Sequence, residues 1–393
     1  MKLQTLKDAD IAHKTVLLRV DYNVPLRNGK VADDTRIKQS LPTLKHLVQQ
    51  DAKIIIMSHL GRPKGEVNEE LRLTPVADHL SKLLDAPIIK VESCIGADVE
   101  EAIKSMKNGQ ILMLENTRFH AEEKKNDPEF AKKLASYADV YVSDAFGTVH
   151  RAHASTEGVA HHLPAYAGFL IEKEIAALSP LLEKPEAPFV LIMGGAKIDT
   201  KIGVIKNYLE KADKIIIGGG LANTFLLARG FDVGASLCEK DKVETAQDIM
   251  LEADKANCEI VMPEDVIAAD EISDDAITAD ANIRGIEGEM QILDIGEESL
   301  KQFVEIINEA ATIIWNGPVG LYEKKPFEKG TREIAWAVKN SQAKTYLGGG
   351  DTVDAIKRFD ISPDSFTHVS TGGGAMLEFL EGKDLPGLKV LKK

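Results

Sequence analysis

Short apolar runs alternate with amphipathic segments along nearly the whole chain of 393 residues. Two of these runs lie at Leu17–Val20 and Ile215–Ile217. Apolar residues at helical spacing cover segments 36–48, 75–84, 128–138 and 300–310. Strands that alternate with helices pair in parallel, because each helix returns the chain to the same edge of the sheet. The pattern therefore predicts the α/β class, with doubly wound parallel sheets.

The residues that follow the apolar runs differ between the two halves of the chain. In the first half they include Asp21, Asn23, His59, Leu60, Gly61, Arg62, Arg118 and Arg151. In the second half they are mostly glycines, namely Gly194, Gly195, Gly218, Gly219, Gly317, Gly349, Gly350, Gly372 and Gly373. Ligands of open α/β sheets bind at the carboxyl ends of strands. We therefore expect an arginine-lined site for a small anion and a glycine-lined site for a polyphosphate, which together indicate a two-substrate phosphoryl transferase.

Four arginines of the first half are candidates for the anion site, together with His59. They are Arg36, Arg62, Arg118 and Arg151. Arginine suits bidentate contacts with carboxylate and phosphate oxygens. Each one alone is better explained by a surface ion pair, but the placement of several near strand ends favours a joint site. Nearby histidines lack acidic or cysteine partners at metal-ligand spacing and are interpreted as loop residues: His150, His153, His161 and His162.

In the second half, a glycine run at 372–374 precedes a helical segment. Exposed N–H groups and a helix N-terminus suit an anion there. Lys197 and Lys201 are four residues apart and share one face if a helix begins here, where they could neutralise phosphoryl oxygens. Asp351 has two interpretations: a ligand for Mg²⁺ carried by nucleotide phosphates, or a helix N-cap.

The change in strand-end residues coincides with a segment of helical periodicity that starts at Gly168 and is ended by Pro185 and Pro188. A single helix joining two α/β lobes is the favoured interpretation, and a surface helix within one domain is the alternative. We predict an N-terminal lobe, a connecting helix, a C-terminal lobe and a terminal segment that packs back on the first lobe, with boundaries at 1–167, 168–185, 186–375 and 376–393.

Composition excludes several classes of protein. The net charge of −14 disfavours a nucleic-acid partner, which would favour a basic surface. Three cysteines are too few for a disulfide framework. No apolar run has the length of a signal peptide or a membrane span. We therefore expect a cytoplasmic protein without a nucleic-acid or membrane partner.

Ten short motifs resemble those of the phosphoglycerate kinase family. In the first half they are Arg19–Pro25, Ser58–Pro63, Leu114–Phe119, Ser143–Gly147 and His150–His153. In the second half they are Gly194–Lys197, Ala222–Phe225, Trp315–Gly320, Gly348–Thr352 and Ser370–Ala375. They follow the family's order from Arg19 to the C-terminal region, so the resemblance covers essentially the whole chain.

The resemblance implies a monomeric, hinge-bending kinase that transfers phosphate between 1,3-bisphosphoglycerate and ADP, giving 3-phosphoglycerate and ATP, with Mg²⁺ on the nucleotide. Matching positions assign the phosphoglycerate to Asp21, Asn23, Arg36, His59, Leu60, Gly61, Arg62, Arg118 and Arg151. They assign the nucleotide to Gly194, Gly195, Lys197, Lys201, Gly218, Gly219, Asn316, Gly317, Pro318, Glu323, Gly349, Gly350, Asp351 and Thr352, with the metal on Asp351. The role of stabilising charge on the transferring phosphoryl group is assigned to Arg36, Lys201, Gly372 and Gly373. Small departures from the family pattern, which touch none of these roles, occur at Thr200, Tyr322 and Leu388.

The chemistry of such a reaction agrees with the residue types. A carboxylate acceptor is already ionised at neutral pH, so the reaction needs no general base. Catalysis then consists of positioning and charge stabilisation, with closure expected to exclude water. Two other classes remain as alternatives. A nicotinamide-dependent oxidoreductase needs a dinucleotide fingerprint, which is absent, and a non-enzymatic binding protein needs no glycine-rich second half.

Overall fold

The computed structural model describes residues 1–393, which divide into two compact units. The first unit comprises Met1–Ser179 together with Asp384–Lys393, and the second comprises Pro180–Lys383. Each unit has a six-stranded parallel sheet of its own, covered by helices on both faces. The predicted fold class, two parallel-sheet α/β units, is confirmed.

The sheet of the first unit has the strand order β5-β6-β4-β1-β7-β8. Its strands are β1 (Thr15–Val20), β4 (Lys53–Met57), β5 (Ile88–Lys90), β6 (Ile111–Met113), β7 (Val140–Asp144) and β8 (Ala165–Ala167). Val16 of β1 pairs with Ile54 of β4 on one side and with Val140 of β7 on the other. The chain thus leaves β1 towards one edge and later fills the other, which creates a topological switch point beside β1.

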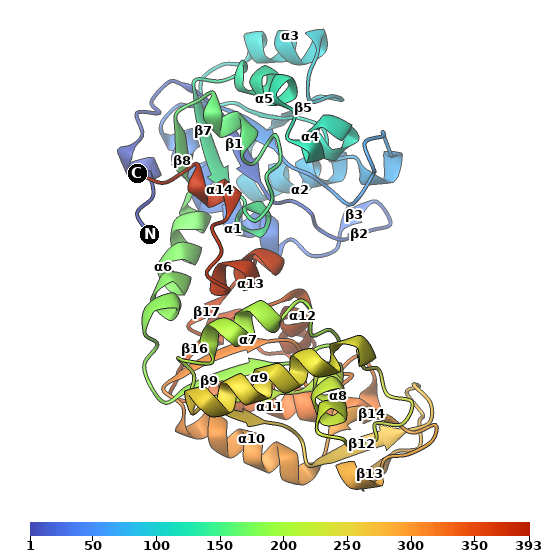
Figure 1. The fold of residues 1–393 in the computed structure, drawn as a ribbon. Helices are drawn as coiled ribbons and strands as arrows, with labels where there is room; N and C mark the ends of the chain where they lie inside the picture. Colours follow the sequence, from blue (N-terminus) through green and yellow to red (C-terminus); the bar gives the residue numbers. More distant parts are fainter. The chain divides into compact units, whose positions relative to one another are not determined.

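Helices cover both faces of this sheet (Figure 1). They are α1 (Thr35–Gln49), α2 (Thr74–Leu84), α3 (Ala97–Ser105), α4 (Ala121–Lys125) and α5 (Pro128–Ala135), and a small hairpin is formed by β2 (Leu26–Arg27) and β3 (Lys30–Val31). Apolar residues at helical spacing, such as Ile37 and Leu44 of α1, pack in one core with Leu18 of β1. Local signals also fix helix ends: the Asp127 carboxylate accepts a hydrogen bond from the Phe130 N–H at the start of α5.

The sheet of the second unit has the order β11-β10-β9-β15-β16-β17. Its strands are β9 (Phe189–Met193), β10 (Lys214–Ile217), β11 (Glu259–Val261), β15 (Thr312–Asn316), β16 (Lys344–Gly348) and β17 (His368–Val369). A three-stranded antiparallel sheet is added by β12 (Asp265–Ala269), β13 (Ala279–Asn282) and β14 (Gln291–Ile295). The main sheet again has its first strand, β9, in the interior, so a second switch point lies beside β9.

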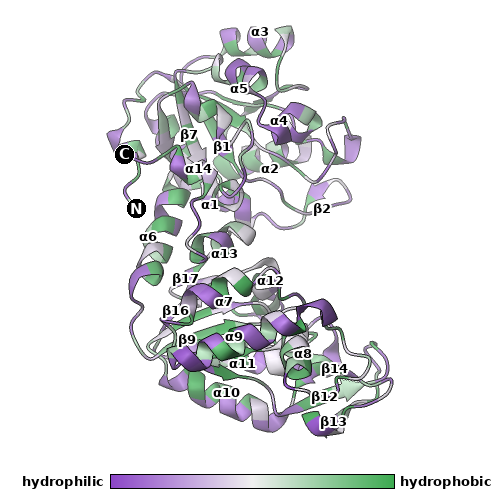
Figure 2. Cartoon of the chain, in the orientation of Figure 1, coloured by the Kyte–Doolittle hydropathy of each residue, from purple (hydrophilic) through white to green (hydrophobic).

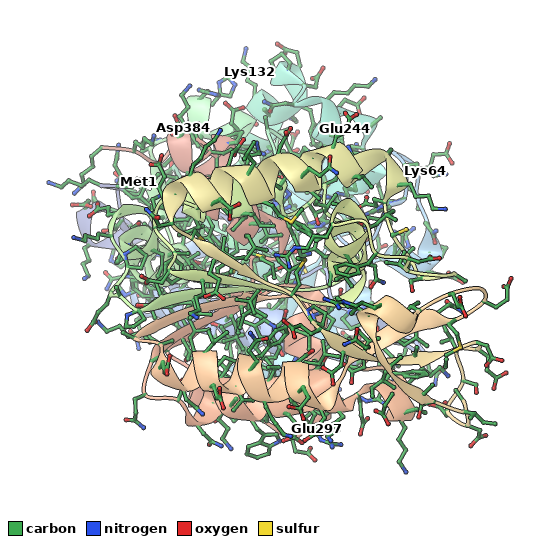
Figure 3. All side chains as sticks on the ribbon, turned by 60° about the horizontal axis from the view of Figure 1, so that its bottom comes forward. Met1, Lys64, Lys132, Glu244, Glu297 and Asp384 are labelled. Atoms are coloured by element: carbon green, nitrogen blue, oxygen red, sulfur yellow. The ribbon has the colours of Figure 1, made fainter.

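The helices of the second unit lie on opposite sides of its main sheet. They are α7 (Ile202–Tyr208), α8 (Gly219–Ala228), α9 (Val243–Ala256), α10 (Glu297–Glu309), α11 (Lys329–Asn340), α12 (Gly350–Arg358) and α13 (Gly374–Leu380). Figure 3 shows Glu244 of α9 and Glu297 of α10 on opposite sides of the sheet. Phe303 of α10 and Ile334 of α11 share a buried core with Trp315 of β15.

The helix expected after Gly168 is α6 (Phe169–Glu183), within which the division between the two units falls. Its first turn is fixed to the first unit, since the Asp144 carboxylate accepts a hydrogen bond from the Leu170 N–H at 2.9 Å. The Thr43 hydroxyl accepts another from the Phe169 N–H. A Cβ at Gly168 would overlap the Asp144 side chain, so this close approach requires glycine.

The boundary predicted at residues 375 and 376 is corrected by the structure, because it falls inside α13. This helix packs on α7, and the Asn207 side-chain amide donates to the Leu380 carbonyl at 2.6 Å. Only Asp384–Lys393 belong to the first unit, where α14 (Pro386–Lys389) packs with its Gly387 N–H bonded to the Val149 carbonyl.

The hydropathy pattern follows this layering. Strands in the middle of each sheet are coloured as hydrophobic, whereas hydrophilic colour is concentrated on the outer helices and loops (Figure 2). No helix in the structure combines the length and the apolar character that crossing a bilayer requires.

Candidate functional site

The predicted anion-binding residues of the first unit follow the carboxyl ends of neighbouring strands. Asp21 follows β1, His59 follows β4, Arg118 lies in a 3₁₀ helix after β6, and Arg151 lies in the loop after β7. Since β6, β4, β1 and β7 are adjacent in the sheet, parallel pairing brings these residues to one edge. This edge contains the switch point beside β1, where ligands of such sheets bind.

A chain of hydrogen bonds connects these residues. Arg36 Nη1, from α1, donates to Asp21 Oδ2 at 2.8 Å and to the Asn23 carbonyl at 3.3 Å. The Asn23 side-chain oxygen accepts from the Gly61 N–H at 2.9 Å, and the Gly61 carbonyl accepts from Arg118 Nη1 at 2.8 Å. Five of the predicted residues are therefore connected in one hydrogen-bond network.

The electrostatics of these residues indicate a positive site. His59 is only 2% exposed, and its pKa is held well below the usual range by burial and then by Arg19, Arg118, Arg36 and Arg151. Burial, followed by the neighbouring Arg151 and Arg19, lowers the pKa of Arg118 to about 10. Arg118 Nε is also buried without a hydrogen-bond partner. A bound anion would supply both the missing charge and the missing acceptor.

The remaining predicted residues of the first unit differ in their accessibility. Arg62 is exposed and forms no ion pair, so its guanidinium is free to reach a ligand. Arg151 is also exposed, and its Nε donates to His150 Nε2 at 2.9 Å. Leu60 is different, because its side chain is buried in the core. Its backbone is also engaged, because its N–H donates to Asn116 Oδ1 at 3.1 Å and its carbonyl accepts from Asn116 Nδ2 at 2.7 Å.

Sequence reasoning missed Arg19 and underestimated two histidines. Arg19 is 1% exposed, and its Nη2 lies 3.2 Å from His59 Nδ1. Its signal was visible, since it is a charge inside the apolar run of a central strand. Both histidines lie outside helices and strands, as predicted, but burial and the neighbouring arginines lower the pKa of His150 to about 4 and that of His153 to about 3, so they also belong to the positive region.

In the second unit, glycines allow the strand ends to approach one another closely. A Cβ at Gly194 would overlap the Pro318 carbonyl, and one at Gly317 would overlap the Gly194 carbonyl. The Gly195 N–H donates to the Pro318 carbonyl at 2.7 Å. Gly219 has a φ of +62°, which only glycine adopts without strain. The predicted glycine turns thus form one bare-backbone surface.

Two pockets border this surface. One, of about 210 Å³, is largely apolar and is lined by residues including Gly195, Gly219, Leu237, Pro318, Val319, Leu321, Glu323 and Asp351. The other, of about 240 Å³, is lined by Gly195, Ala196, Lys197, Thr200, Lys201, Asn316, Gly317, Gly349, Gly350, Asp351 and Thr352. An apolar pocket beside a lysine- and glycine-lined pocket suits a flat aromatic group attached to a polyphosphate. The lining of these two pockets does not include Gly218, Gly372 or Gly373.

The two lysines precede a helix instead of sharing a helical face. The prediction of a common face is wrong, because α7 begins only at Ile202 and a tight turn holds the Lys201 N–H to the Ile198 carbonyl. Both lysines nevertheless line the polar pocket. Lys201 is 8% exposed, and burial lowers its pKa although Asp351 and Glu239 act to raise it.

The capping interpretation of Asp351 is excluded by the structure. The N-cap of α12 is Gly349, with a φ of +97°, and Asp351 lies in the first helical turn. Its exposed carboxylate lines both pockets. No group of three His, Cys, Asp or Glu residues is arranged to hold a metal by protein ligands alone. A single carboxylate fits Mg²⁺, which commonly takes one or two protein carboxylates and completes its shell with substrate phosphates and water.

The fold and the residue types at these two strand-end edges fit one class of protein, an α/β phosphotransferase with two substrates. The phosphoglycerate kinase family model matches residues 6–383. The chain belongs to this family.

Curated relatives and solved structures agree. The chain is 51% identical over 388 residues to the phosphoglycerate kinase of Dictyoglomus turgidum, with 98% of each chain covered. It is 51% identical over 392 residues to that of Herpetosiphon aurantiacus, covering 100% of this chain and 99% of the relative. The structure of the Coxiella burnetii phosphoglycerate kinase matches with a TM-score of 0.88 at 42% identity, covering 99% of this chain and 98% of that one. The Pyrococcus horikoshii OT3 enzyme matches at 0.86 and 36%, with the same coverage.

The family prediction is confirmed, and with it the reaction. The chain is a phosphotransferase with a carboxyl acceptor, which reversibly transfers phosphate from 1,3-bisphosphoglycerate to ADP and forms 3-phosphoglycerate and ATP. The oxidoreductase and non-enzymatic alternatives are therefore excluded.

Proposed function

We propose that the first unit binds the phosphoglycerate and the second unit binds the nucleotide. The first assignment rests on one observation: a cluster of mutually repelling arginines at a strand-end edge, among which Arg118 is buried with an unpartnered guanidinium N–H. The second rests on the glycine surface and its two adjoining pockets. Arg36, Arg62, Arg118 and Arg151 are the residues that bind the anionic groups of the phosphoglycerate.

Within this assignment, direct transfer needs no proton abstraction in the direction that consumes ATP. The acceptor carboxylate of 3-phosphoglycerate is ionised at neutral pH and attacks phosphorus itself. Arg36 and Lys201 stabilise charge on the three equatorial oxygens of the transferring group, and the Gly373 N–H assists them. The Gly372 N–H donates instead to Ser370 Oγ at 3.1 Å. Asp21 holds Arg36 by its 2.8 Å ion pair, so the guanidinium is oriented before the substrate arrives.

Mg²⁺ belongs with the nucleotide in this proposal, and Asp351 is the residue that holds it. The fit depends on an exposed carboxylate that caps no helix and lines both pockets. When bound, the metal neutralises phosphate charge and orients the oxygens of the nucleotide. Lys197 and Lys201 bind the phosphates, and Glu323 in the apolar pocket accepts from the ribose.

Transfer also requires the two ligands to meet. We propose hinge bending that brings the units together before chemistry, because reacting atoms must approach within about 3.5 Å. Closure would also protect an acyl phosphate from water. The proposal further includes a monomeric state and a cytoplasmic location, consistent with glycolytic relatives.

A trapping experiment tests the proposed function. The protein is incubated with 3-phosphoglycerate, Mg²⁺ and ATP in hydroxylamine, which converts acyl phosphate into a hydroxamate. We expect hydroxamate only when all three are present. Equilibrium binding of each ligand to Arg118→Met and Lys197→Met variants then separates the sites. Loss of nucleotide affinity in the Arg118 variant, with phosphoglycerate affinity unchanged, would reverse the assignment.

A further inference from the structure

A buried chain of hydrogen bonds runs behind the arginine set and ends on His59. It starts at Glu123 of α4, whose carboxylate is fully buried and accepts from the Ser155 hydroxyl at 2.6 Å and from the Ser155 N–H at 2.9 Å. The Ser155 oxygen accepts in turn from Arg19 Nε at 2.8 Å. Arg19 Nη2 then lies 3.2 Å from His59 Nδ1. None of these links except His59 belongs to the predicted substrate-binding set.

Every donor in this chain has a fixed direction. A guanidinium has five N–H donors and no acceptor, so Arg19 donates to both of its neighbours. Ser155 must therefore accept with its oxygen and give its single hydroxyl proton to Glu123. His59 Nδ1 must accept, which requires that it carry no proton. The proton of a neutral His59 is consequently on Nε2, and this atom has no hydrogen-bond partner in the structure.

Asp21 opposes the effect of Arg19 on the position of the His59 proton. Its Oδ1 lies 3.8 Å from the same Nδ1 of His59, too far for a hydrogen bond but close enough to favour a proton on that nitrogen. Two carboxylate–histidine arrangements would be ordinary here: an Nδ1–H tautomer or a charged imidazolium. Arg19 opposes both, because an Nδ1–H would point at its N–H groups.

The charged groups around His59 also favour its neutral form. They are Arg19 of β1, Asp21 after β1, Arg36 of α1, Arg118 of the 3₁₀ helix after β6, and Arg151 after β7. Asp21 is the only anion among them, and it is already paired with Arg36 at 2.8 Å. Together with burial, the four arginines keep the pKa of His59 well below its usual range.

We propose that Arg19, held by Ser155 and Glu123, is a positioning residue that fixes His59 as the neutral Nε2–H tautomer. His59 then offers the bound anion a directed N–H donor instead of a positive charge. The arginines supply the charge that attracts the anion, and His59 supplies orientation that does not change between pH 6 and 8. The identity of the anion as phosphoglycerate rests on the proposed function, but the tautomer does not.

The test is nitrogen NMR on the full-length protein labelled with ¹⁵N-histidine, without ligand. The signals of His59 are assigned among the ten histidines by comparison with His59→Gln. We expect a protonated Nε2, an unprotonated Nδ1 and no titration between pH 6 and 8. An Nδ1–H tautomer, or an imidazolium that titrates in this range, would overturn the proposal. The tautomer itself is read from the unmodified protein, and the His59→Gln variant serves only to assign the signals.

Variants then locate the cause. Arg19→Met keeps a long unbranched side chain but removes the donor, and Asp21 should then draw the proton to Nδ1. Ser155→Ala removes the acceptor of Arg19 and should give a mixture of the two tautomers. Thr117→Val is the matched control, since Thr117 also donates to Glu123, at 3.3 Å, but does not touch Arg19. An Nε2–H signal unchanged in Arg19→Met would show that Arg19 does not set the tautomer.

A ligand titration distinguishes this proposal from the proposed function. 3-Phosphoglycerate should shift the His59 Nε2–H signal of the unmodified protein. In kinetics, the KM for 3-phosphoglycerate of Arg19→Met, divided by that of the parent, should rise severalfold between pH 6 and 8. A correct tautomer with no response to 3-phosphoglycerate would contradict the substrate assignment and leave the tautomer intact. A KM ratio that is the same at both pH values would contradict the positioning role of Arg19.

Discussion

At the scale of single residues, Arg36 is the member of the anion site that combines a fixed geometry with partial exposure. Its guanidinium is bonded to Asp21 and the Asn23 carbonyl, and its side chain is 34% exposed. We expect Arg36→Ala to lower kcat about 100-fold or more, because it removes a preorganised charge from the transferring phosphoryl group, with a smaller effect on nucleotide KM. Steady-state kinetics check this, with the exposed Arg27→Ala of the same unit as control. An unchanged kcat would contradict the assigned role.

Asp351 carries the second residue-scale prediction. Asp351→Asn keeps the size of the side chain but removes the charge that the proposal places on Mg²⁺. We expect the KM for Mg-ATP to rise about 10-fold or more, while affinity for metal-free ADP changes little. Isothermal titration with and without Mg²⁺ separates the two effects. The exposed Asp364→Asn of the same unit is the control, and equal weakening with and without metal would argue against a metal ligand.

Sequence patterns identified candidate residues that follow strand ends better than residues inside a strand. Arg118 and Asp351 became candidates because they follow strand ends, and strand ends are visible as changes in apolarity. Arg19 was missed although it is a visible charge inside an apolar run, because its role depends on which residues it meets. Its partners Ser155 and Glu123 lie 136 and 104 residues away in the chain, so only the fold shows that they meet. Side-chain networks of this kind depend on three-dimensional pairing, which local periodicity does not encode.

At the scale of elements, strands and long helices were predictable and their boundaries less so. Hydrophobic periodicity gave α1, α2 and α10 to within a few residues. It failed after β9, where the glycine surface and the turn at Ile198 delay α7 to Ile202. Glycine disfavours helix formation, so a glycine-rich turn after a strand moves the start of the next helix further along the chain.

The first turn of α6 supplies an element-scale prediction about pH. Burial raises the pKa of Asp144 to about 7, although hydrogen bonds from Thr43 and the Leu170 N–H act to lower it. In the unfolded chain the pKa is near 4, so between pH 4 and 7 the folded state binds more protons. The contribution of Asp144 to the free energy of unfolding is full below about pH 4 and is lost as pH rises through 7. The free energy of unfolding therefore falls by about 2.5 kcal/mol between pH 5 and 8.

We therefore expect Asp144→Asn to remove this dependence. An asparagine keeps an acceptor for the Leu170 N–H, so the variant should gain stability relative to the parent as pH rises from 5 to 8. Urea unfolding followed by circular dichroism measures the difference. Asp294→Asn is a matched variant in the second unit, since burial raises the pKa of Asp294 to about 7 as well. A difference between variant and parent that is constant with pH would contradict a titrating Asp144.

At the scale of the whole molecule, a net charge of −14 coexists with a cationic site. The excess negative charge lies elsewhere in the chain, so the arginine cluster of the first unit is a local positive region. The two-unit organisation was also predictable, since the strand-end chemistry changes at the connecting helix. The exact return point of the chain was not, because α13 and α14 both carry buried apolar residues, and the unit on which each one packs is visible only in the fold.

The last prediction concerns the C-terminal segment Asp384–Lys393, which packs on the first unit. Leu385, Leu388 and Leu391 are each at most 1% exposed in the first unit, and Leu388→Ala should destabilise that unit by about 2–4 kcal/mol. Both tryptophans, Trp315 and Trp336, lie in the second unit, so their fluorescence follows that unit alone. We expect the variant to shift the unfolding transition seen by circular dichroism to lower urea, while the fluorescence transition and nucleotide affinity stay close to those of the parent. Leu251→Ala, at an exposed position of α9, is the control. If fluorescence shifted as far as circular dichroism, the two units would unfold as one cooperative body and the terminal segment would stabilise both.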